Sequence, residues 1–122
     1  MATVRYFVTD VDASIEFYET LGFKLKDRPG PPFASMTRDD LELWVSGPGT
    51  SAMKPMPDGA KPGPGGWNRF AIVVDDIEAT VSALKSHGAV FRNEILEGPG
   101  GKQILLEDPS GNPIELFQPR GA

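Results

Sequence analysis

The sequence of 122 residues contains no cysteine and only one histidine. Without cysteine it has no disulfide framework, no thiolate nucleophile and no thiolate metal ligand. It also has no apolar run of membrane-spanning length and no basic-then-apolar signal segment, so we expect a cytoplasmic protein with no membrane partner. Lys and Arg number 12 against 17 Asp and Glu, and they are scattered. This argues against nucleic acid as a partner, because phosphate binding needs a concentrated basic face.

What the sequence does contain is an internal repeat. Asp10 and Asp76 begin two similar stretches, Gly22 and Gly88 end them, and both pairs are 66 positions apart. Self-similarity on this scale predicts two copies of one supersecondary unit, with a site where their matching strands face each other. The matching final strands are Leu41–Leu43 and Ile114–Leu116.

The apolar pattern predicts the same order of elements, βαβββ, in both copies. Alternating apolar residues indicate strands, and apolar residues at helical spacing indicate helices. Eight strands and two helices predict an α+β protein in which each helix covers one face of a curved sheet. The strands are expected at 3–9, 23–26, 33–37 and 41–45, and again at 67–74, 90–92, 102–107 and 113–118. The first helix runs to residue 21 from a cap at Asp10 or Asp12, and the second spans 77–87 after a cap at Asp75 or Asp76.

Residues 47–66 differ in composition from both copies, with five Pro and six Gly among twenty residues. Such a segment cannot bury enough surface to offset its ordering entropy. We therefore predict a linker that joins a first module at 1–46 to a second module at 67–122. A lid that contacts a ligand through Met53 and Met56 is the alternative.

Side chains alternate along a strand, so one choice of register fixes both of its faces. The uniformly apolar sets should pack under the helices: Val4, Tyr6 and Val8; Leu41, Leu43 and Val45; Phe70, Ile72 and Val74; Ile114 and Leu116. The opposite faces combine aromatic and charged groups, either as a small-molecule pocket or as solvated positions with a few salt bridges. Two matches across the repeat favour the pocket, Glu42 with Glu115 and Trp44 with Phe117. The candidate ligand-binding residues are Arg5, Phe7, Glu42, Trp44, Arg69, Glu115 and Phe117.

Three segments resemble the vicinal-oxygen-chelate superfamily, which contains glyoxalases, bleomycin-resistance proteins and extradiol dioxygenases. The resemblance rests on Val8–Tyr18 with Leu21–Phe23, on Val74–Ala79 and on Glu107–Leu116. It implies two βαβββ modules related by pseudo-twofold symmetry, with curved mixed sheets enclosing a pocket and one helix per module on the outside. It also implies a homodimer. One scaffold of this kind hosts many chemistries, so the activity needs evidence of its own.

Metal enzymes of this superfamily hold the ion with a His or Glu in the first strand and a Glu in the last strand of each module. The matching last-strand positions here are Glu42 and Glu115, but the first-strand positions are Thr3 and Arg69. Two carboxylates without imidazole hold only a weak, hydrated cation, and a guanidinium beside them repels it. We therefore expect Arg69 to pair with Glu115 and Arg5 to pair with Glu42, with no metal and no cofactor.

These features predict a small-molecule-binding protein that works without a metal and sequesters an antibiotic or another aromatic metabolite, as the bleomycin-resistance branch does. Its aromatic walls would stack flat ligands, and its carboxylates would favour a positive group. The first alternative is an enzyme of the same superfamily, a lyase, isomerase or dioxygenase-like catalyst, with Glu115 as catalytic base and with or without a weakly held divalent metal. The second is a non-catalytic interaction module whose pocket is filled by its own side chains.

Overall fold

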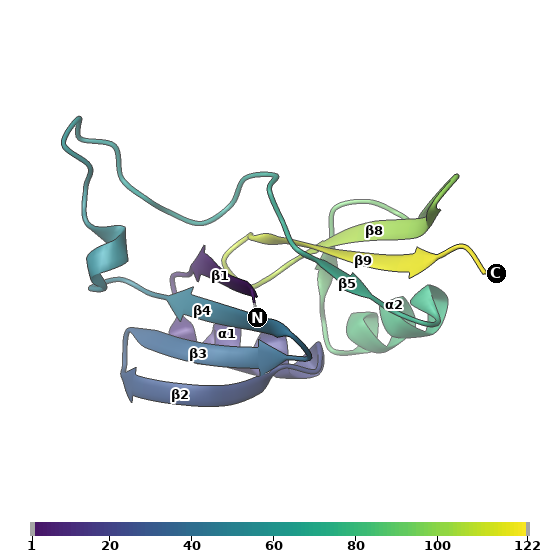
Figure 1. The fold of residues 1–122 in the computed structure, drawn as a ribbon, viewed down its shortest axis with the longest axis horizontal. Helices are drawn as coiled ribbons and strands as arrows, with labels where there is room; N and C mark the ends of the chain where they lie inside the picture. The colour runs from purple at the N-terminus through teal and green to yellow at the C-terminus, as the bar shows by residue number, and fades with distance from the viewer. Residues whose placement is uncertain (1, 122) are drawn as a thin grey trace. The chain divides into compact units, whose positions relative to one another are not determined.

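The structure, a computed structural model, describes residues 2–121, which divide into two compact units (Figure 1). The first unit comprises residues 2–65 with 109–112, and the second comprises 66–108 with 113–121. Each unit contains one mixed β-sheet and one α-helix. The α+β class with two βαβββ modules is therefore confirmed, whereas a single pocket enclosed by both sheets stays a prediction.

The first unit consists of β1 (Ala2–Phe7), α1 (Val11–Thr20), β2 (Lys24–Gly30), β3 (Phe33–Arg38), β4 (Leu41–Ser46) and the short 3-10 helix η1 (Ser51–Met53). Its sheet has the order β1-β4-β3-β2. Strands β1 and β4 are parallel, and the other neighbours are antiparallel. Helix α1 contacts β2, β3 and β4 and buries Val11, Ile15 and Tyr18, so it covers one face and leaves the other open.

The second unit consists of β5 (Ala71–Val73), α2 (Ile77–Ser86), β6 (Val90–Phe91), β7 (Leu96–Gly98), β8 (Gly101–Glu107) and β9 (Pro113–Pro119). Strands β5 and β9 are parallel, and β6, β7 and β9 all pair with β8 in antiparallel fashion. Strand β7 is absent from the sequence-based prediction, which has four strands in this module. A strand of three residues is too short to show an alternating pattern.

Two strands differ from their predicted lengths by three residues or more, β5 and β2, and a proline is involved in each case. Strand β5 begins at Ala71 rather than at residue 67, because the next hydrogen bond in the ladder would need an N–H that Pro113 lacks. Strand β2 continues to Gly30 instead of ending at Lys26, although it contains Pro29. It is an edge strand with two shifts in register, and proline is tolerated at such places.

The positions that mark the repeat are the two ends of the helices. Asp10 and Asp76 are the N-caps, and each accepts a hydrogen bond from the backbone N–H three residues later, at 3.0 and 3.1 Å. Gly22 and Gly88 follow the last helical turns with φ of +88° and +83°. Glycine adopts this left-handed conformation without the steric cost that a side chain brings, so both exits depend on it.

The predicted faces of the strands are confirmed by the pattern of burial. The core side chains of the sheets are 9% exposed or less, whereas Val4, Leu41, Phe70 and Val74 are half-buried at the ends of their sets. The buried members of the predicted sets are Tyr6, Val8, Leu43, Val45, Ile72, Ile114 and Leu116.

No helix among residues 2–121 has the length and apolar character that crossing a bilayer requires.

Strand pairing changes which residues correspond across the repeat. Arg5 pairs with Trp44, and Ala71, its counterpart 66 positions later, pairs with Glu115. Trp44 and Glu115 therefore occupy equivalent places, and the match of Glu42 with Glu115 is wrong by two residues. The turn between β3 and β4 is shorter than the turn between β8 and β9, so the shared sequence pattern does not carry one register into both sheets.

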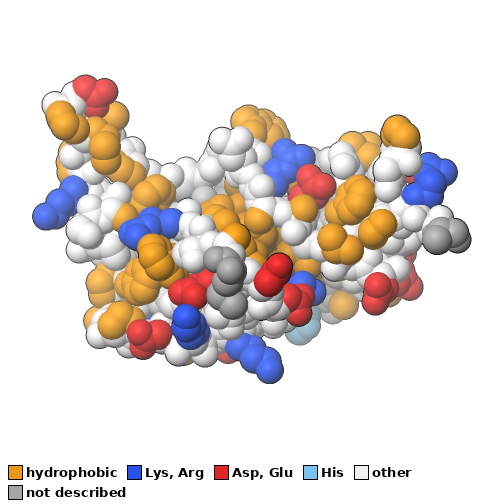
Figure 2. All heavy atoms as spheres, in the orientation of Figure 1, with side chains coloured by type: hydrophobic (Ala, Val, Ile, Leu, Met, Phe, Trp, Pro, Cys, Tyr) orange, Lys and Arg blue, Asp and Glu red, His pale blue; other side chains and the backbone are white. Residues whose placement is uncertain are grey.

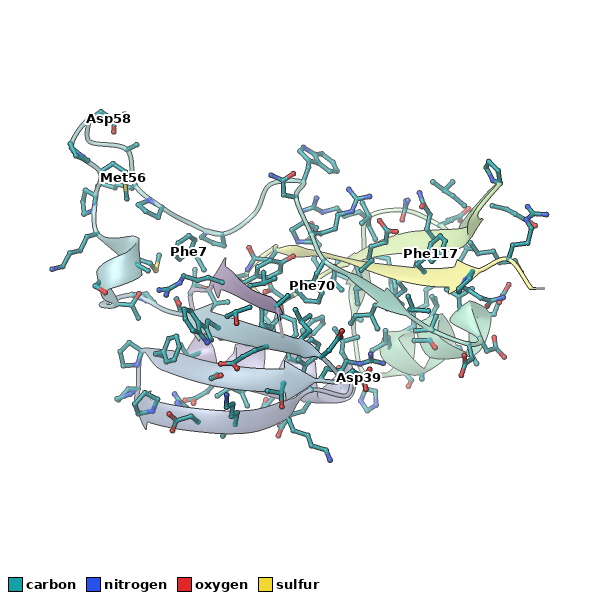
Figure 3. All side chains as sticks on the ribbon, in the orientation of Figure 1. Phe7, Asp39, Met56, Asp58, Phe70 and Phe117 are labelled. Carbon is teal, nitrogen blue, oxygen red and sulfur yellow. The ribbon has the colours of Figure 1, made fainter. Side chains whose placement is uncertain are left out.

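Residues 47–66 are irregular apart from η1. The Gly47 N–H donates to the Pro32 carbonyl at 2.7 Å, which ties the start of the segment to the turn after β2. Near its tip, the Gly59 N–H donates to the Met56 carbonyl at 2.8 Å, and the Met56 side chain is 47% exposed (Figure 3). A role as linker or as lid stays a prediction.

Candidate functional site

The open face of the first sheet carries a connected group of side chains around Trp44, here called the Trp44 cluster: Arg5, Lys26, Ser35, Glu42 and Trp44. The Trp44 Nε1–H and the Ser35 hydroxyl both donate to Glu42 Oε2, each at 2.8 Å. Lys26 Nζ lies 2.9 Å from Glu42 Oε1. Both oxygens of Glu42 are therefore occupied, and the carboxylate fixes the edge of the indole ring.

The predicted pairing of Arg5 with Glu42 is wrong, because Lys26 takes that place. Strand β2 shifts its register between Leu25 and Asp27, and Lys26 reaches Glu42 from this irregular point. The Arg5 guanidinium instead lies over the Trp44 ring, 4.9 Å from its centroid. This is a cation–π contact between neighbouring strands.

The Lys26–Glu42 ion pair gives the cluster a defined pH dependence. The hydrogen bond from Lys26, reinforced by those from Trp44 and Ser35, lowers the pKa of Glu42 from 4.5 to about 2. Because the pKa is lower in the folded state, ionised Glu42 stabilises the fold above about pH 4.5, and that stabilisation is lost as the pH falls toward 2. Thermal unfolding of Glu42→Gln should thus depend less on pH in this window than that of the native chain. Equal slopes in both proteins would contradict the lowered pKa.

The second predicted ion pair, Arg69 with Glu115, is confirmed in the second unit. Arg69 donates to Glu115 Oε1 through Nε at 3.1 Å and through Nη2 at 2.9 Å. Its Nη1 donates to the Trp67 carbonyl at 3.2 Å, so the guanidinium is held on two sides. Glu115 keeps only 16% of its side-chain surface exposed. The fixed cation next to Glu115 thus belongs to the chain itself.

The predicted aromatic residues belong to both sheets, and one further ring was missed. Phe7 lies at the end of β1 and Phe117 on β9, and both are half-buried (Figure 3). Phe33 on β3 meets the Trp44 ring edge to face, with centroids 6.1 Å apart. Phe33 lies two residues before Ser35 on the same strand, so the two side chains share the open face. This alternation along β3 is the sequence signal from which Phe33 could have been predicted.

The open face of the second sheet is largely apolar and exposed. By strand register, Val73, Val90 and Leu96 share a face with Phe117, and these three are 52% to 60% exposed. Figure 2 shows hydrophobic side chains gathered over β8 and β9 with charged groups among them. Trp67, 70% exposed, lies against Arg92 at 4.8 Å from ring centroid to guanidinium carbon.

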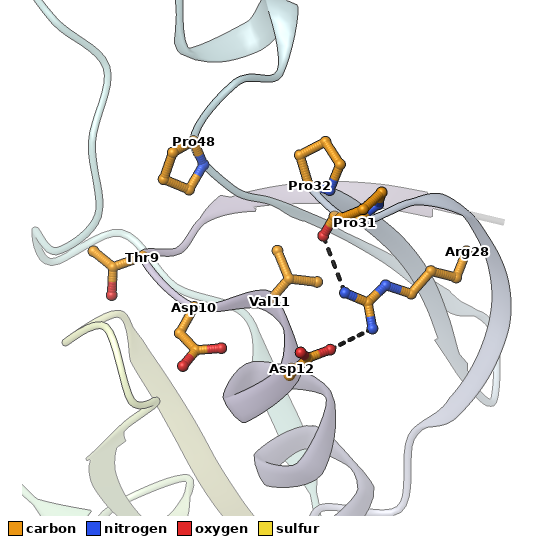
Figure 4. Close-up of a pocket in the computed structure, with 8 residues that line it drawn as sticks. All are labelled: Thr9, Asp10, Val11, Asp12, Arg28, Pro31, Pro32 and Pro48. Atoms are coloured by element: carbon orange, nitrogen blue, oxygen red, sulfur yellow. Dashed lines mark hydrogen bonds and ion pairs between the residues drawn. The ribbon is translucent and has the colours of Figure 1, made fainter.

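A separate hollow of about 470 Å³ opens beside the start of α1 (Figure 4). Three prolines line it together with Arg28, which pairs with Asp12 and donates to the Pro31 carbonyl at 3.0 Å. None of the predicted site residues lines it. The hollow is therefore distinct from the Trp44 cluster, and Arg28 fastens the turn after β2 to α1.

The side chains present do not form a ligand set for a catalytic metal ion. Within residues 2–121 no three His, Asp or Glu side chains come together as a metal-binding group. Glu42 is paired with Lys26, and Glu115 is paired with Arg69. A Lewis-acid metal usually needs about three such ligands, which these paired carboxylates do not supply.

Comparison with known proteins gives one curated relative at 30% identity, named "Probable lactoylglutathione lyase, chloroplastic" from Arabidopsis thaliana. The match covers 97% of this chain but 35% of that protein, so the chain spans about a third of the relative's length. An uncharacterized protein of Mycolicibacterium smegmatis is 26% identical, with 90% of this chain and 85% of that protein covered.

Solved structures share the whole fold. TnmS3 from Streptomyces sp. CB03234, described as an antibiotic binding protein, is 27% identical with a TM-score of 0.75, and the match covers 97% of this chain and 93% of that one. TioX from Micromonospora sp. ML1 has a TM-score of 0.78 at 18% identity and covers 97% of each chain, which shows the fold alone. The family model described as "Glyoxalase/Bleomycin resistance protein/Dioxygenase superfamily" matches residues 1–116, and the chain belongs to that superfamily.

Proposed function

We propose that the chain is a small-molecule-binding protein that works without a metal and seats a planar aromatic ligand against Trp44. The observation that carries this proposal is the fixed indole on an open sheet face. Its Nε1–H is held by Glu42 at 2.8 Å, and Phe33 meets the ring edge to face. An aromatic wall that is already ordered costs a ligand less entropy than a mobile one, and it offers a large surface for stacking.

The charges of the site support binding rather than chemistry. Glu42 is engaged by Lys26, Ser35 and Trp44, so its role is to orient the indole ring. Glu115 is engaged by Arg69 in the other unit. Carboxylates committed to cations of their own chain neither attract a positive ligand strongly nor assemble a metal site.

The superfamily membership and one relative point to the class of ligand. TnmS3, 27% identical over nearly the whole chain, is described as an antibiotic binding protein. Antibiotics with flat aromatic systems, or aromatic metabolites of similar shape, match the surface that Trp44 and Phe33 offer. The proposal is therefore sequestration of an aromatic antibiotic or metabolite without chemical change.

Titration of the Trp67→Phe variant, followed by tryptophan fluorescence, tests the proposal. The sequence has two tryptophans, and this variant keeps only Trp44. We expect a panel of planar aromatic antibiotics to include compounds that change the Trp44 emission in a saturable way. Calorimetry should then show that Trp44→Leu weakens binding about tenfold or more, since the stacking surface is lost. Trp67→Phe should bind like the native chain. Absence of a saturable response to every compound would refute the proposal.

One observation favours an enzyme as the second candidate. Both contacts from Arg69 end on Glu115 Oε1, and Oε2 has no hydrogen bond within residues 2–121. A free carboxylate oxygen is what a general base requires, and the relative at 30% identity is named a probable lyase. Loading with nickel, zinc, manganese or iron, followed by desalting and metal analysis, discriminates the two. Stoichiometric tight metal, or turnover that Glu115→Gln abolishes, would replace binding by catalysis.

We further propose that the protein forms a homodimer and is located in the cytoplasm. The exposed apolar side chains Val73, Val90 and Leu96 share one face of the second sheet. Exposed apolar patches of this kind mark interaction surfaces, and a second copy of the chain is the occupant that the superfamily resemblance implies.

A further inference from the structure

Arg5 carries a charge that no carboxylate of the described chain neutralises. Within residues 2–121 its guanidinium has one recorded contact, the face of the Trp44 ring at 4.9 Å. Stacking on a ring face uses none of the five N–H donors of a guanidinium. Arg5 is also exposed, so these donors are accessible to a ligand that lies beside Trp44.

The other polar groups of the Trp44 cluster are already used. Lys26 and Glu42 neutralise each other at 2.9 Å, and Ser35 and Trp44 spend their donors on Glu42. What remains for a ligand is an aromatic surface with one adjacent cation. In the second unit, Ala71 stands at the place that corresponds to Arg5, and Arg69 is paired with Glu115.

We infer that the ligand is a planar aromatic acid, whose anionic group binds the Arg5 guanidinium while its ring packs beside Trp44. The inference rests on the proposed function and reverses the charge that the two carboxylates suggested from sequence. A carboxylate matches the fork of donors on a guanidinium, and a sulfonate shares that chemistry. A cationic ligand meets Arg5 as a like charge, and Glu42 offers it no free oxygen.

Three probes of one shape test the sign of the charge: 2-naphthoate, 2-naphthamide and 2-naphthylmethylammonium. Calorimetry on the full chain at low salt should give an affinity for the carboxylate about five- to tenfold above that for the amide, as expected for a charge-assisted pair at a partly exposed site. The ammonium compound should bind most weakly. Shifts of the Trp44 indole N–H signal in NMR spectra, absent for the indole of Trp67, should place all three probes at the cluster.

Two matched variants assign the preference to Arg5. Arg5→Gln should bring the affinities for carboxylate and amide to about the same value. Lys24→Gln removes one positive charge from an exposed position of the same sheet and should keep the native preference. A preference that survives Arg5→Gln, or that Lys24→Gln also abolishes, overturns the inference.

The failure of this inference is distinguishable from failure of the proposed function. If the three probes bind equally and Trp44→Leu weakens all of them, aromatic binding stands and the role of Arg5 falls. If no probe binds, and no compound of the antibiotic panel binds, both fall together.

Discussion

Replacement of Gly101 by alanine is expected to destabilise the fold by about 3 kcal/mol or more, through strain and overpacking together. Gly101 opens β8 opposite Pro119 of β9 with φ of +149°, a region that side chains rarely adopt. A Cβ placed there would lie 2.1 Å from the Gln118 carbonyl oxygen. The backbone atom cannot yield as a flexible side chain would, so the two strands must separate at this end.

Gly100 provides the matched control. A Cβ on Gly100 would meet only the Phe117 ring, at the ordinary contact distance of 3.8 Å. Gly100→Ala should therefore change the free energy of unfolding by less than about 1 kcal/mol. Urea unfolding of both variants at one protein concentration measures the difference, since dimerisation would otherwise shift the midpoint. Similar stabilities of Gly100→Ala and Gly101→Ala would mean that β8 and β9 are not paired in this register.

The repeat could be predicted from sequence because its markers act locally. Asp10 and Asp76 satisfy N–H groups three residues away, and Gly22 and Gly88 supply the left-handed exits. Such short-range requirements impose the same residue types wherever the element recurs. Alternation along the strands then determined which side chains enter the core.

Pairing between strands could not be predicted in the same way. Glu42 and Glu115 lie in similar Leu-Glu-Leu and Ile-Glu-Leu patterns, yet the ladders place Trp44 opposite Arg5 and Glu115 opposite Ala71. Register depends on the lengths of the turns that precede each strand, and these differ between the modules. Aligning the last strands of the two modules by sequence pattern alone therefore misplaces one against the other by two residues.

The charge that the Trp44 cluster offers to a ligand also depends on how the strands pair. Lys26 was not a candidate, because an alternating strand gives no sign that an irregularity will bring its amine within 2.9 Å of Glu42. Once Lys26 occupies the carboxylate, Arg5 is released to stack on Trp44. A single shift in an edge strand thus changes the expected ligand from a cation to an anion.

Asn112→Ala is the second change expected to have a large effect, a loss of about 2–4 kcal/mol in the free energy of unfolding. Asn112 is 4% exposed and ends the turn between β8 and β9, of which residues 109–112 belong to the first unit. Its Nδ2 donates to the Phe7 carbonyl at 2.7 Å, and its Oδ1 accepts from the Gly65 N–H at 2.8 Å. Alanine removes both partners, so two backbone groups lose the bonds that offset their desolvation.

Ser110 in the same turn is the control for this prediction. Its hydroxyl accepts the Thr9 N–H at 2.9 Å at an exposed place, where water can substitute. Ser110→Ala should therefore cost less than about 1 kcal/mol. Hydrogen exchange of the Gly65 amide gives a local readout, and it should accelerate in Asn112→Ala but not in Ser110→Ala. Unchanged exchange of Gly65 in Asn112→Ala would show that this side chain does not hold the end of residues 47–66 against the first unit.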